Sequence, residues 1–475
     1  MIQEKCPYVE KCGACHMGQT TYEEELIAKK ELVESHIGKY CRNIHDVAGM
    51  YYPFHYRNKV HAVFGRLKDE VIAGTYSEGT HTIVPIDNCL IEDAQASAII
   101  KTVTELVKSF KIWIYNEDTG RGVLRHVLVR KGMSTKQIMV VLVTACPEFP
   151  HKNNFVAELR KRHPEITTIV QNINEANTTM VLGERNKPLY GEGYIEDVLC
   201  GLRFRISPNS FYQVNSAQTQ VLYKKAIQAA GLTGKETVVD AYCGIGTIGM
   251  AMASKAGKVL GIELNRDAVK DAKANAKRNN LNNIHFVAAD ATEYLTSMAQ
   301  EGAKADVVVM DPPRSGSTEE FIQAVAQLAP ERVVYVSCNP ETLGRDLESF
   351  KKVKYRAVEA WPVDMFGWTN HVETVCLLSK LHEAKHHVNV RLDMEELDLT
   401  AAESKATYEE IKKYVAEHND GMKVSNLYIA QVKAKYGIIE RENYNLPKSE
   451  DTKHPQCPKE KEDAIMGALK YFQMI

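Results

Sequence analysis

The strongest constraint on the fold is a regular alternation of apolar runs and helix-like segments between about residue 206 and residue 380. The runs are TVVDAYCG, KVLGIELN, IHFVAAD, ADVVVMDPP and RVVYVSC, and helical stretches such as RDAVKDAKANAKRNN separate them. Strands buried on both faces form such continuous apolar runs, and parallel strands need helical crossovers. The rhythm therefore predicts an α/β, doubly wound (Rossmann-like) domain over residues 206–384. Two further runs, KYRAVEAWPVD and HVETVCLLSK, close its sheet near Lys380.

The flanking regions have different patterns, and 475 residues leave room for two to four domains. Residues 1–90 contain clustered cysteines, a helix-like stretch and short strand-like runs, and residues 91–205 mix helices with runs such as QIMVVLVTA. We interpret both as one α+β domain. Residues 385–475 are charged and helical in pattern. Two amphipathic stretches there flank Gly421, which fits either a helix-turn-helix or a packing or partner-binding appendage.

Composition excludes several classes of protein. The net charge is −2, from 59 basic and 61 acidic residues, so any surface for nucleic acid must be local. No apolar run approaches the roughly 18 residues of a membrane helix, and the polar start MIQEKCPYVE shows no signal peptide. We therefore expect a cytoplasmic protein. Eleven cysteines are too sparse for a disulfide scaffold, and in a reducing compartment a cysteine cluster favours a metal site.

Three motifs along the predicted sheet indicate an adenosine cofactor. Gly244, Gly246 and Gly249 match G-x-G-x-x-G after the first strand, and Glu263 ends the next strand, where an acid can bind ribose hydroxyls. These features fit NAD or S-adenosylmethionine equally. Asp311 then opens the sequence DPPRSG at the end of the fourth strand. Such a loop is unusual for a dehydrogenase and suits a methyltransferase that holds a planar, nitrogen-bearing target.

Cys338 and Glu373 complete a chemistry for methylating a pyrimidine carbon. Cys338 ends an apolar run, and Asn339 and Pro340 are good first residues of a helix, whose positive end favours thiolate over thiol. A thiolate that adds to C6 of uracil makes C5 nucleophilic, and a base must later remove the C5 proton. Glu373 is the candidate base. His371 lies two residues earlier in the predicted strand, so we expect both side chains on one face.

The motifs SFYQVN, DAYCGIGT, DPPRSG, VSCNPETLGRDL and TNHVETV together resemble the RNA (uracil-5-)-methyltransferase family, and they span roughly residues 205–380. The resemblance implies that Cys338 is the nucleophile and Glu373 the proton-abstracting base. The chain departs from the family pattern at Gly367, where proline is frequent, and at Thr247, where some members carry asparagine. The implied contacts to S-adenosylmethionine are Gln213, Tyr242, Gly244, Thr247, Glu263, Asp290 and Asp311.

Four cysteines form a candidate metal site. Cys6, Cys12 and Cys15 have the spacing C-x5-C-x2-C, and Cys89 follows in PIDNCLIED. Four thiolates fit zinc or an iron–sulfur cluster, and spacing alone does not separate the two. The resemblance implies a [4Fe-4S] cluster, because the branch of the family that resembles 23S rRNA methyltransferases carries one on this pattern. We expect the cluster to be structural, and the other six cysteines to be packing residues or exposed thiols.

The predicted function is S-adenosylmethionine-dependent methylation of C5 of a uridine in 23S rRNA, which gives 5-methyluridine. The expected partner is RNA, specifically 23S rRNA, with no membrane or DNA partner, and the enzyme is expected to be a monomer. The alternatives are methylation of a tRNA uridine, RNA cytosine-C5 methylation, an NAD-dependent oxidoreductase and a non-catalytic RNA-binding protein. Local basic residues are candidates for phosphate contacts: Arg57, Lys59, Arg66, Lys68, Arg121, Arg125, Arg130 and Lys131.

Overall fold

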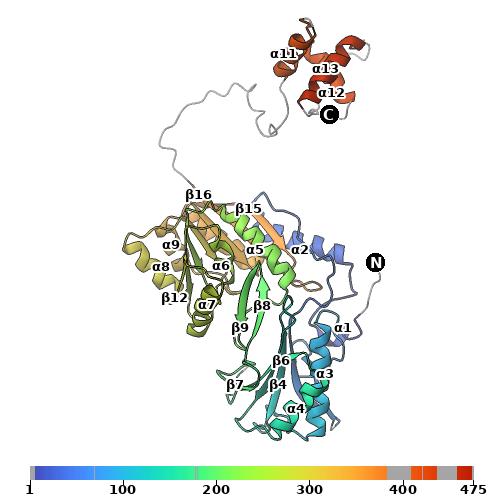
Figure 1. Cartoon of the computed structure of the whole chain (residues 1–475), viewed down its shortest axis with the longest axis vertical. Coiled ribbons are helices and arrows are strands. Elements are labelled where there is room, and N and C mark those ends of the chain that lie inside the picture. Colours follow the sequence, from blue (N-terminus) through green and yellow to red (C-terminus); the bar gives the residue numbers. More distant parts are fainter. Residues whose placement is uncertain are drawn as a thin grey trace. The chain divides into compact units, whose positions relative to one another are not determined.

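The computed structural model describes residues 6–68, 70–176, 178, 180–381, 408–419, 421–435 and 457–472. The chain divides into two compact units, Met1–His382 and Glu383–Ile475 (Figure 1). Parts of the predicted carboxyl-terminal extension, residues 385–407, 436–456 and 473–475, lie outside the described residues. The larger unit contains two seven-stranded sheets and a two-stranded ribbon.

The first sheet is mostly antiparallel, in the order β3-β2-β1-β4-β5-β6-β7, and only β5 and β6 pair in parallel. Helices α3 (Ala94–Ser109) and α4 (Lys152–Arg162) cover one face of it, as Figure 1 shows. The α+β pattern expected for this part of the chain is present. The strands are β1 (Lys59–Leu67), β2 (Glu70–Tyr76), β3 (Ile83–Pro85), β4 (Leu124–Lys131), β5 (Ile138–Thr144), β6 (Ile166–Ile173) and β7 (Arg185–Tyr190).

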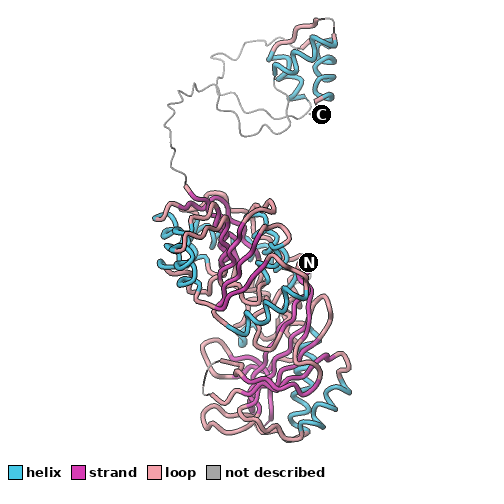
Figure 2. Tube along the Cα trace, turned by 60° about the vertical axis from the view of Figure 1, so that its left-hand side comes forward, coloured by secondary structure: helices cyan, strands magenta, loops and turns pink. Residues whose placement is uncertain are grey.

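The second sheet is the predicted α/β sheet, in the order β12-β11-β10-β13-β14-β16-β15. In Figure 2 the strands of the larger unit run through its middle, with helices on either side. The first five strands in this order pair in parallel, whereas β16 is antiparallel to both of its neighbours. The doubly wound fold is therefore confirmed, with one reversed strand inserted near the edge. The strands are β10 (Thr237–Ala241), β11 (Lys258–Glu263), β12 (Ile284–Ala288), β13 (Val307–Met310), β14 (Arg332–Ser337), β15 (Tyr355–Val363) and β16 (Glu373–Lys380).

Helices cover both faces of this sheet, which explains why its strands are apolar throughout. One face packs in a core with α5, α6 and α7, and the other packs with α8, α9 and α10. Leu222 is buried in the first of these cores, and Phe321 is buried in the second. The helices are α5 (Ser216–Ala230), α6 (Thr247–Ala253), α7 (Arg266–Arg278), α8 (Ala291–Gln300), α9 (Glu319–Leu328) and α10 (Pro340–Lys352).

The amino-terminal segment packs against the second sheet. After the short α1 (Val9–Cys12), helix α2 (Tyr22–Ile37) begins with a capping box between Thr21 and Glu24. Its residues Val33 and Ile37 are fully buried in the core beneath α8, α9 and α10. The chain that follows α2 forms single bridges to β15. Part of the chain expected in the α+β domain therefore supports the sheet that carries the candidate site.

A ribbon of β8 (Ile195–Leu199) and β9 (Leu202–Ile206) connects the two sheets. One continuous hydrophobic core contains Val141 from the first sheet, Phe204 from the ribbon and Val334 from the second sheet. A shared core of this kind restricts motion between two sheets, because sliding would expose apolar surface from both.

The smaller unit is helical where the structure describes it. Helices α11 (Tyr408–His418), α12 (Asn426–Lys435) and α13 (Lys459–Tyr471) share a core that includes Ile411, Ile429 and Ile465. The two predicted amphipathic helices correspond to α11 and α12, and α13 adds a third. Among the described residues of the whole chain, no helix combines the length and the apolar character that a membrane crossing requires.

Candidate active site

Cys338 lies between the end of β14 and the start of α10, as the sequence predicts. The strand ends at Ser337, and Asn339 caps the helix with its side-chain oxygen 3.1 Å from the amide nitrogen of Glu341. Pro340 occupies the first turn, where its missing N–H is not needed. This local sequence holds the Cys338 thiol at the carboxyl edge of the sheet, where α/β proteins bind their ligands.

The pairing of β14 with β16 brings Glu373 to the same edge. Ser337, the last residue of β14, pairs with Thr374, so the next residues along the register are Cys338 and Glu373. Because β16 runs antiparallel to β14, its first residue lies beside the end of β14. Glu373 is only 4% exposed, and its other neighbour is Val363 at the end of β15. The strand reversal therefore places a buried carboxyl group next to the thiol.

The charge state of the thiol differs from the expectation. Burial, together with the carboxylates of Glu373 and Asp311, raises the pKa of Cys338 to about 11, while Arg314 opposes the shift. The helix N-terminus was expected to favour the thiolate, but burial and two acids outweigh this partial charge. Burial likewise raises the pKa of Glu373 to about 8, with Asp311 adding to the shift. Without ligands, the surroundings of the site therefore favour the uncharged forms of both groups.

Asp311 begins the loop that follows β13, and α10 holds this loop in place. Burial raises the pKa of Asp311 to about 7. The backbone oxygen of Arg314 accepts hydrogen bonds from Asn339 Nδ2 and Thr342 Oγ1, both at 3.3 Å. The DPPRSG loop and the loop of the cysteine are therefore fastened to each other.

Asp346 of α10 anchors the far end of the same loop. Its Oδ2 accepts hydrogen bonds from the Ser317 amide and the Tyr335 hydroxyl, both at 2.6 Å. Arg345 donates to the Ser315 and Ser317 oxygens at 2.9 Å and also pairs with Asp346. Asp346 is 2% exposed. The sequence analysis missed it, since its motif NPETLGRDL shows only a helical pattern.

The glycine-rich turn after β10 has the geometry of a cofactor loop. Tyr242, Gly244 and Gly246 all have positive φ angles, of 63°, 55° and 81°. Both oxygens of Glu263 accept backbone hydrogen bonds, from Gly244 at 3.0 Å and from Asn265 at 2.8 Å. The acid at the end of β11 is thus fixed against the glycine turn, and a glycine at position 244 leaves open space beside it.

Asp240 is a buried acid of this region that the sequence analysis did not single out. Its Oδ2 accepts a hydrogen bond of 2.8 Å from the Gly249 amide, and its Oδ1 has no hydrogen-bond partner. Burial raises the pKa of Asp240 to about 7, and the charges of Asp311 and Glu263 add to the shift. A concentration of buried carboxyl groups beside a glycine turn favours a cationic ligand.

The other predicted cofactor residues lie on segments that flank this turn. Gln213 is 9% exposed and precedes α5, and its backbone oxygen accepts a hydrogen bond of 3.0 Å from Asn58. Asp290 caps α8 with one carboxylate oxygen. Thr247 already has an internal partner, because its hydroxyl lies 2.6 Å from that of buried Tyr223. Tyr242 packs its ring 5.2 Å from that of Phe321.

His371 lies outside the strand that carries Glu373. The strand β16 begins at Glu373, so His371 belongs to the preceding turn. Its side chain is exposed and packs edge-on against Phe366, whereas Glu373 is buried. Burial lowers the pKa of His371, and Arg314 lowers it further. The strand therefore begins two residues later than the predicted common face assumed, and the common face stays a prediction.

Comparisons with known proteins agree with this geometry. The model of the tRNA (uracil-5-)-methyltransferase family matches residues 185–381. An uncharacterized RNA methyltransferase of Caldanaerobacter subterraneus subsp. tengcongensis is 42% identical over 383 residues, which cover 80% of this chain and 85% of the relative. A second one, of Halalkalibacterium halodurans, is 41% identical over 381 residues, with 79% and 83% covered.

The chain belongs to the RNA (uracil-5-)-methyltransferase family. A solved structure, the Pyrococcus abyssi tRNA (uracil-54, C5)-methyltransferase in complex with S-adenosyl-L-homocysteine, superposes with a TM-score of 0.65 at 27% identity. The match covers 79% of this chain and 87% of that chain. The protein is therefore an S-adenosylmethionine-dependent RNA (uracil-5-)-methyltransferase, and the glycine turn and DPPRSG loop are the parts of its fold suited to that cofactor.

The four predicted metal-binding cysteines of this methyltransferase lie in one region. Cys6 is buried in a hydrophobic cluster with Trp368, and Cys15 and Cys89 pack against the same cluster. Burial raises the pKa of Cys12, and the charge of Cys6 adds to the shift. The donors have the type and number that a cluster needs. Within the described residues, however, no three His, Cys, Asp or Glu side chains converge closely enough to hold a metal ion.

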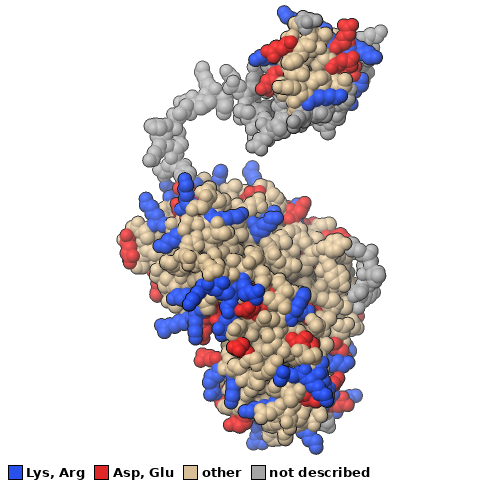
Figure 3. All heavy atoms as spheres, viewed as in Figure 1, with Lys and Arg blue, Asp and Glu red and all other residues tan. Residues whose placement is uncertain are grey.

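Several basic residues expected to face RNA are instead used inside the enzyme. Arg130 is 2% exposed and donates to the Ser210 oxygen at 2.9 Å, and Arg125 is 3% exposed. Lys131 forms an ion pair of 2.7 Å with Asp93. Charge on these half-buried strands serves packing, whereas Arg66, Lys68 and Arg121 are exposed. Figure 3 shows Lys and Arg side chains gathered over α7 and near β9, which the sequence analysis did not single out.

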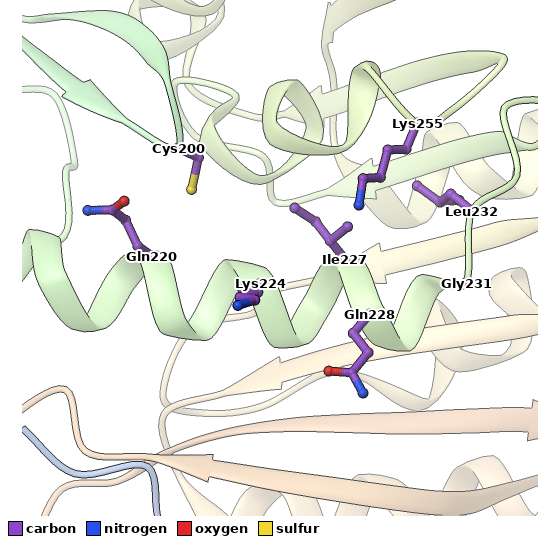
Figure 4. A pocket seen from close by; sticks show the side chains of 8 residues that line it. All are labelled: Cys200, Gln220, Lys224, Ile227, Gln228, Gly231, Leu232 and Lys255. Carbon is purple, nitrogen blue, oxygen red and sulfur yellow. The ribbon is translucent and has the colours of Figure 1, made fainter.

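A separate cavity of about 640 Å³ lies along α5 (Figure 4). Side chains from α5, Cys200 of the β8–β9 turn and Lys255 after α6 line it. None of the predicted catalytic or cofactor residues belongs to its lining. The cavity is therefore distinct from the candidate site at the ends of the strands of the second sheet.

Proposed function

We propose that this methyltransferase modifies C5 of a uridine in 23S rRNA and that Cys338 and Glu373 carry out the chemistry. The observation that carries the proposal is the register of β14 and β16, which sets a buried carboxyl group beside the thiol. Addition to C6 and proton removal from C5 involve adjacent ring atoms, so the two groups must act side by side.

The reaction divides into three steps that balance. The Cys338 thiol releases its proton to solvent, its sulfur adds to C6 of uracil, and the electron pair of the C5–C6 double bond moves into the O4 enolate. C5 then attacks the methyl group of S-adenosylmethionine, and S-adenosylhomocysteine leaves. Finally, Glu373 as carboxylate takes the C5 proton, the C5–C6 double bond reforms, and the Cys338 thiolate departs.

Before these steps, the Cys338 thiol and the Glu373 carboxyl group must each lose a proton. The pKa of Glu373 lies near 8 and that of Cys338 near 11 while no cation is bound. The sulfonium of the cofactor carries a positive charge, and an opposite charge nearby favours the ionised form of both groups. We propose that binding of S-adenosylmethionine beside Asp311, Glu263 and Tyr242 provides this charge, with the remaining contacts from Gln213, Gly244, Thr247 and Asp290.

The assignment to 23S rRNA is supported by the four cysteines, which the family resemblance associates with the 23S rRNA branch. We propose that Cys6, Cys12, Cys15 and Cys89 hold a structural [4Fe-4S] cluster, for which thiolate is the usual ligand. The thiols would have to turn toward one centre, and no step of methyl transfer requires the cluster. We further propose that the enzyme acts as a cytoplasmic monomer.

A tRNA uridine is the second candidate substrate. It is favoured by the likeness to the Pyrococcus abyssi enzyme, whose name specifies uracil-54 of tRNA. The two candidates are separated by incubating the purified protein with labelled S-adenosylmethionine and unmodified transcripts of 23S rRNA or tRNA. Label in the rRNA alone supports the proposal, and label in the tRNA alone replaces it with the second candidate.

The roles of the two residues are tested with Glu373→Gln. Glutamine keeps the size and hydrogen bonding of the side chain but cannot accept the C5 proton. We expect a covalent protein–RNA adduct that runs slowly on a denaturing gel and requires both RNA and S-adenosylmethionine. The adduct should form best where the target base is readily extruded from its stack.

The double variant Cys338→Ala/Glu373→Gln is the matched control, because it keeps the altered base and lacks the nucleophile. It should form no adduct. Free turnover by Glu373→Gln, or adduct formation by the double variant, would show that other groups perform these steps.

A further inference from the structure

The turn between β15 and β16, residues 364–372, is held by side chains from distant parts of the chain. The ammonium of Lys29, on α2, lies 2.6 Å from Asp364 Oδ1 and 3.1 Å from the backbone oxygen of Phe366. Lys29 is 2% exposed and Asp364 is fully buried. A buried charge is retained only where partners compensate it, so this contact fixes where the turn begins.

Glu25 holds the middle of the turn from the same helix. Its carboxylate accepts the Trp368 amide hydrogen, with oxygen–nitrogen distances of 2.7 and 2.9 Å. One of its oxygens also lies 2.6 Å from the Lys29 ammonium. Two carboxylates thus share the Lys29 ammonium. Glu25 contacts the turn from outside, and Asp364 is the first residue of the turn.

Trp368 has an unfavourable backbone conformation that these contacts maintain. Its φ angle is 67°, a region that bulky residues rarely adopt. Its backbone oxygen accepts a hydrogen bond of 2.9 Å from the His16 amide, and its indole donates one of 2.8 Å to the Pro53 oxygen. Such a conformation persists only where the surroundings determine it, and it is typical of functional sites.

Both ends of this turn are attached to Glu373. The last residue of β15, Val363, pairs with Glu373, and Asp364 follows Val363 directly. On the other side of the turn, Trp368 lies only five positions before Glu373, so a short segment connects the two residues. A change in the turn therefore moves Glu373 by one of two routes. One route is its pairing with Val363, and the other is the short segment that connects it to Trp368.

We propose that Glu25 and Lys29 are positioning residues that hold the Glu373 carboxylate against C5 of the bound uracil through Asp364 and Trp368. This inference rests on the proposed role of Glu373 as the base. The amino-terminal helix α2 thereby contributes to proton removal without contact with the substrate. Displacement of a catalytic group by about 1 Å can cost on the order of 100-fold in rate.

The test compares Glu25→Ala, which removes the acceptor of the Trp368 amide, with Glu25→Gln, which keeps a neutral acceptor of the same size. The full-length proteins are assayed on the pooled unmodified 23S rRNA and tRNA transcripts. We expect Glu25→Ala to lower kcat by about 30- to 100-fold. Its affinity for S-adenosylhomocysteine should stay within about twofold of the wild type, and Glu25→Gln should recover most of the loss.

The decisive measurement is the fraction of enzyme trapped as covalent adduct at steady state. Addition and methyl transfer precede proton removal, so a misplaced base should make the adduct accumulate, as in Glu373→Gln. A variant that is merely less well folded would lose activity without trapping adduct. Lys30→Met is the matched control, because it removes an exposed ion pair with Asp46 from the neighbouring position of α2. It should behave as wild type.

Wild-type turnover by folded Glu25→Ala, or lower turnover without adduct, would overturn the inference. If Glu25→Ala does not fold, Trp368→Phe decides: it removes only the indole hydrogen bond and part of the packing, and should lose about fivefold in kcat while trapping adduct. Trp368→Phe without adduct would also overturn the inference. Absence of adduct in Glu373→Gln itself would instead refute the proposed role of Glu373.

Discussion

At the scale of single residues, the site is dominated by buried acids. Asp240, Asp311 and Glu373 each have a raised pKa, mainly because of burial, and Glu373 and Asp311 in turn raise the pKa of Cys338. Cys338 directly precedes the N-terminus of α10. A site with this charge distribution disfavours the thiolate until a cation enters. The proposed mechanism therefore couples methyl transfer to binding of the sulfonium cofactor.

Cys338→Ala should abolish methylation and leave cofactor binding within about twofold of wild type, because the side chain that forms the bond to C6 is lost. The measurement is incorporation of labelled methyl groups, with S-adenosylhomocysteine affinity as the control for folding. Cys146→Ala is a matched substitution of a cysteine outside the site. Residual turnover within about tenfold of wild type, which corresponds to only about 1.4 kcal/mol of barrier, would contradict the assignment.

Affinity for S-adenosylmethionine should rise between pH 6 and pH 8. Asp240 and Asp311 have pKa values near 7 in the free protein, so at pH 6 they are largely protonated. A sulfonium favours their ionised forms, so its binding releases protons and becomes about tenfold tighter once the pH exceeds 7. Calorimetry in two buffers of different ionisation enthalpy measures both effects. S-adenosylhomocysteine lacks the sulfonium and should show a weaker dependence; equal pH profiles for the two would contradict the prediction.

At the scale of structural elements, α10 holds the loop that contains Cys338 next to the loop that begins at Asp311. Its N-terminus follows Cys338, and its side chains Arg345 and Asp346 hold the loop that begins at Asp311. The helix therefore fixes the distance between the thiol and the acid. Helix α2 has a corresponding role for the turn before Glu373.

Asp346→Ala should lower the free energy of unfolding by about 3 kcal/mol, because it leaves the buried Ser317 amide and Tyr335 hydroxyl without their acceptor. Methylation should fall as well, since the DPPRSG loop loses its anchor. Chemical denaturation and methyl incorporation are the measurements. Lys352→Ala on the same helix removes an exposed pair with Glu319 and should change stability by less than about 0.5 kcal/mol. Similar losses in both variants would refute the anchoring role.

At the scale of the whole molecule, three parts of the chain meet at the candidate site, while the carboxyl-terminal unit has a core of its own. The second sheet carries the reactive residues, α2 contacts the turn before Glu373, and the cysteine region packs against Trp368. Among the described residues, α11, α12 and α13 and the segments beside them form this core.

The protein purified without oxygen should contain about four irons per chain, the content of a [4Fe-4S] cluster held by four thiolates. Iron and zinc analysis, with the absorbance of the brown protein, is the measurement. Cys89→Ser should lose iron, whereas Cys146→Ser should keep it, since Cys146 lies outside the cysteine region. Zinc without iron would refute the cluster and leave the methyltransferase function unaffected.

Truncation after Leu381 should leave a folded protein that binds S-adenosylmethionine within about twofold of the full chain. The reason is that the first compact unit ends at His382, next to this point, and that the described residues of each unit form a hydrophobic core. Thermal unfolding and cofactor titration are the measurements. Loss of cofactor binding in the truncated protein would show that the second unit supports the first.

The sequence by itself determined the sheet that carries the site, because continuous apolar strands and helical crossovers are local patterns. It also predicted the start of α10 after Cys338, since capping depends on a few adjacent residues. Cys338, Glu373 and Asp311 could be singled out from their motifs, and the family follows from those motifs. What only the tertiary structure decided was pairing between distant segments. The reversed strand β16 sets Glu373 beside Cys338, α2 buries Glu25 and Lys29 against the turn at Trp368, and Arg125 and Arg130 turn inward. The charge state of Cys338 was also decided by the tertiary structure. Its pKa depends on burial and on acids from other strands, which no local sequence pattern contains.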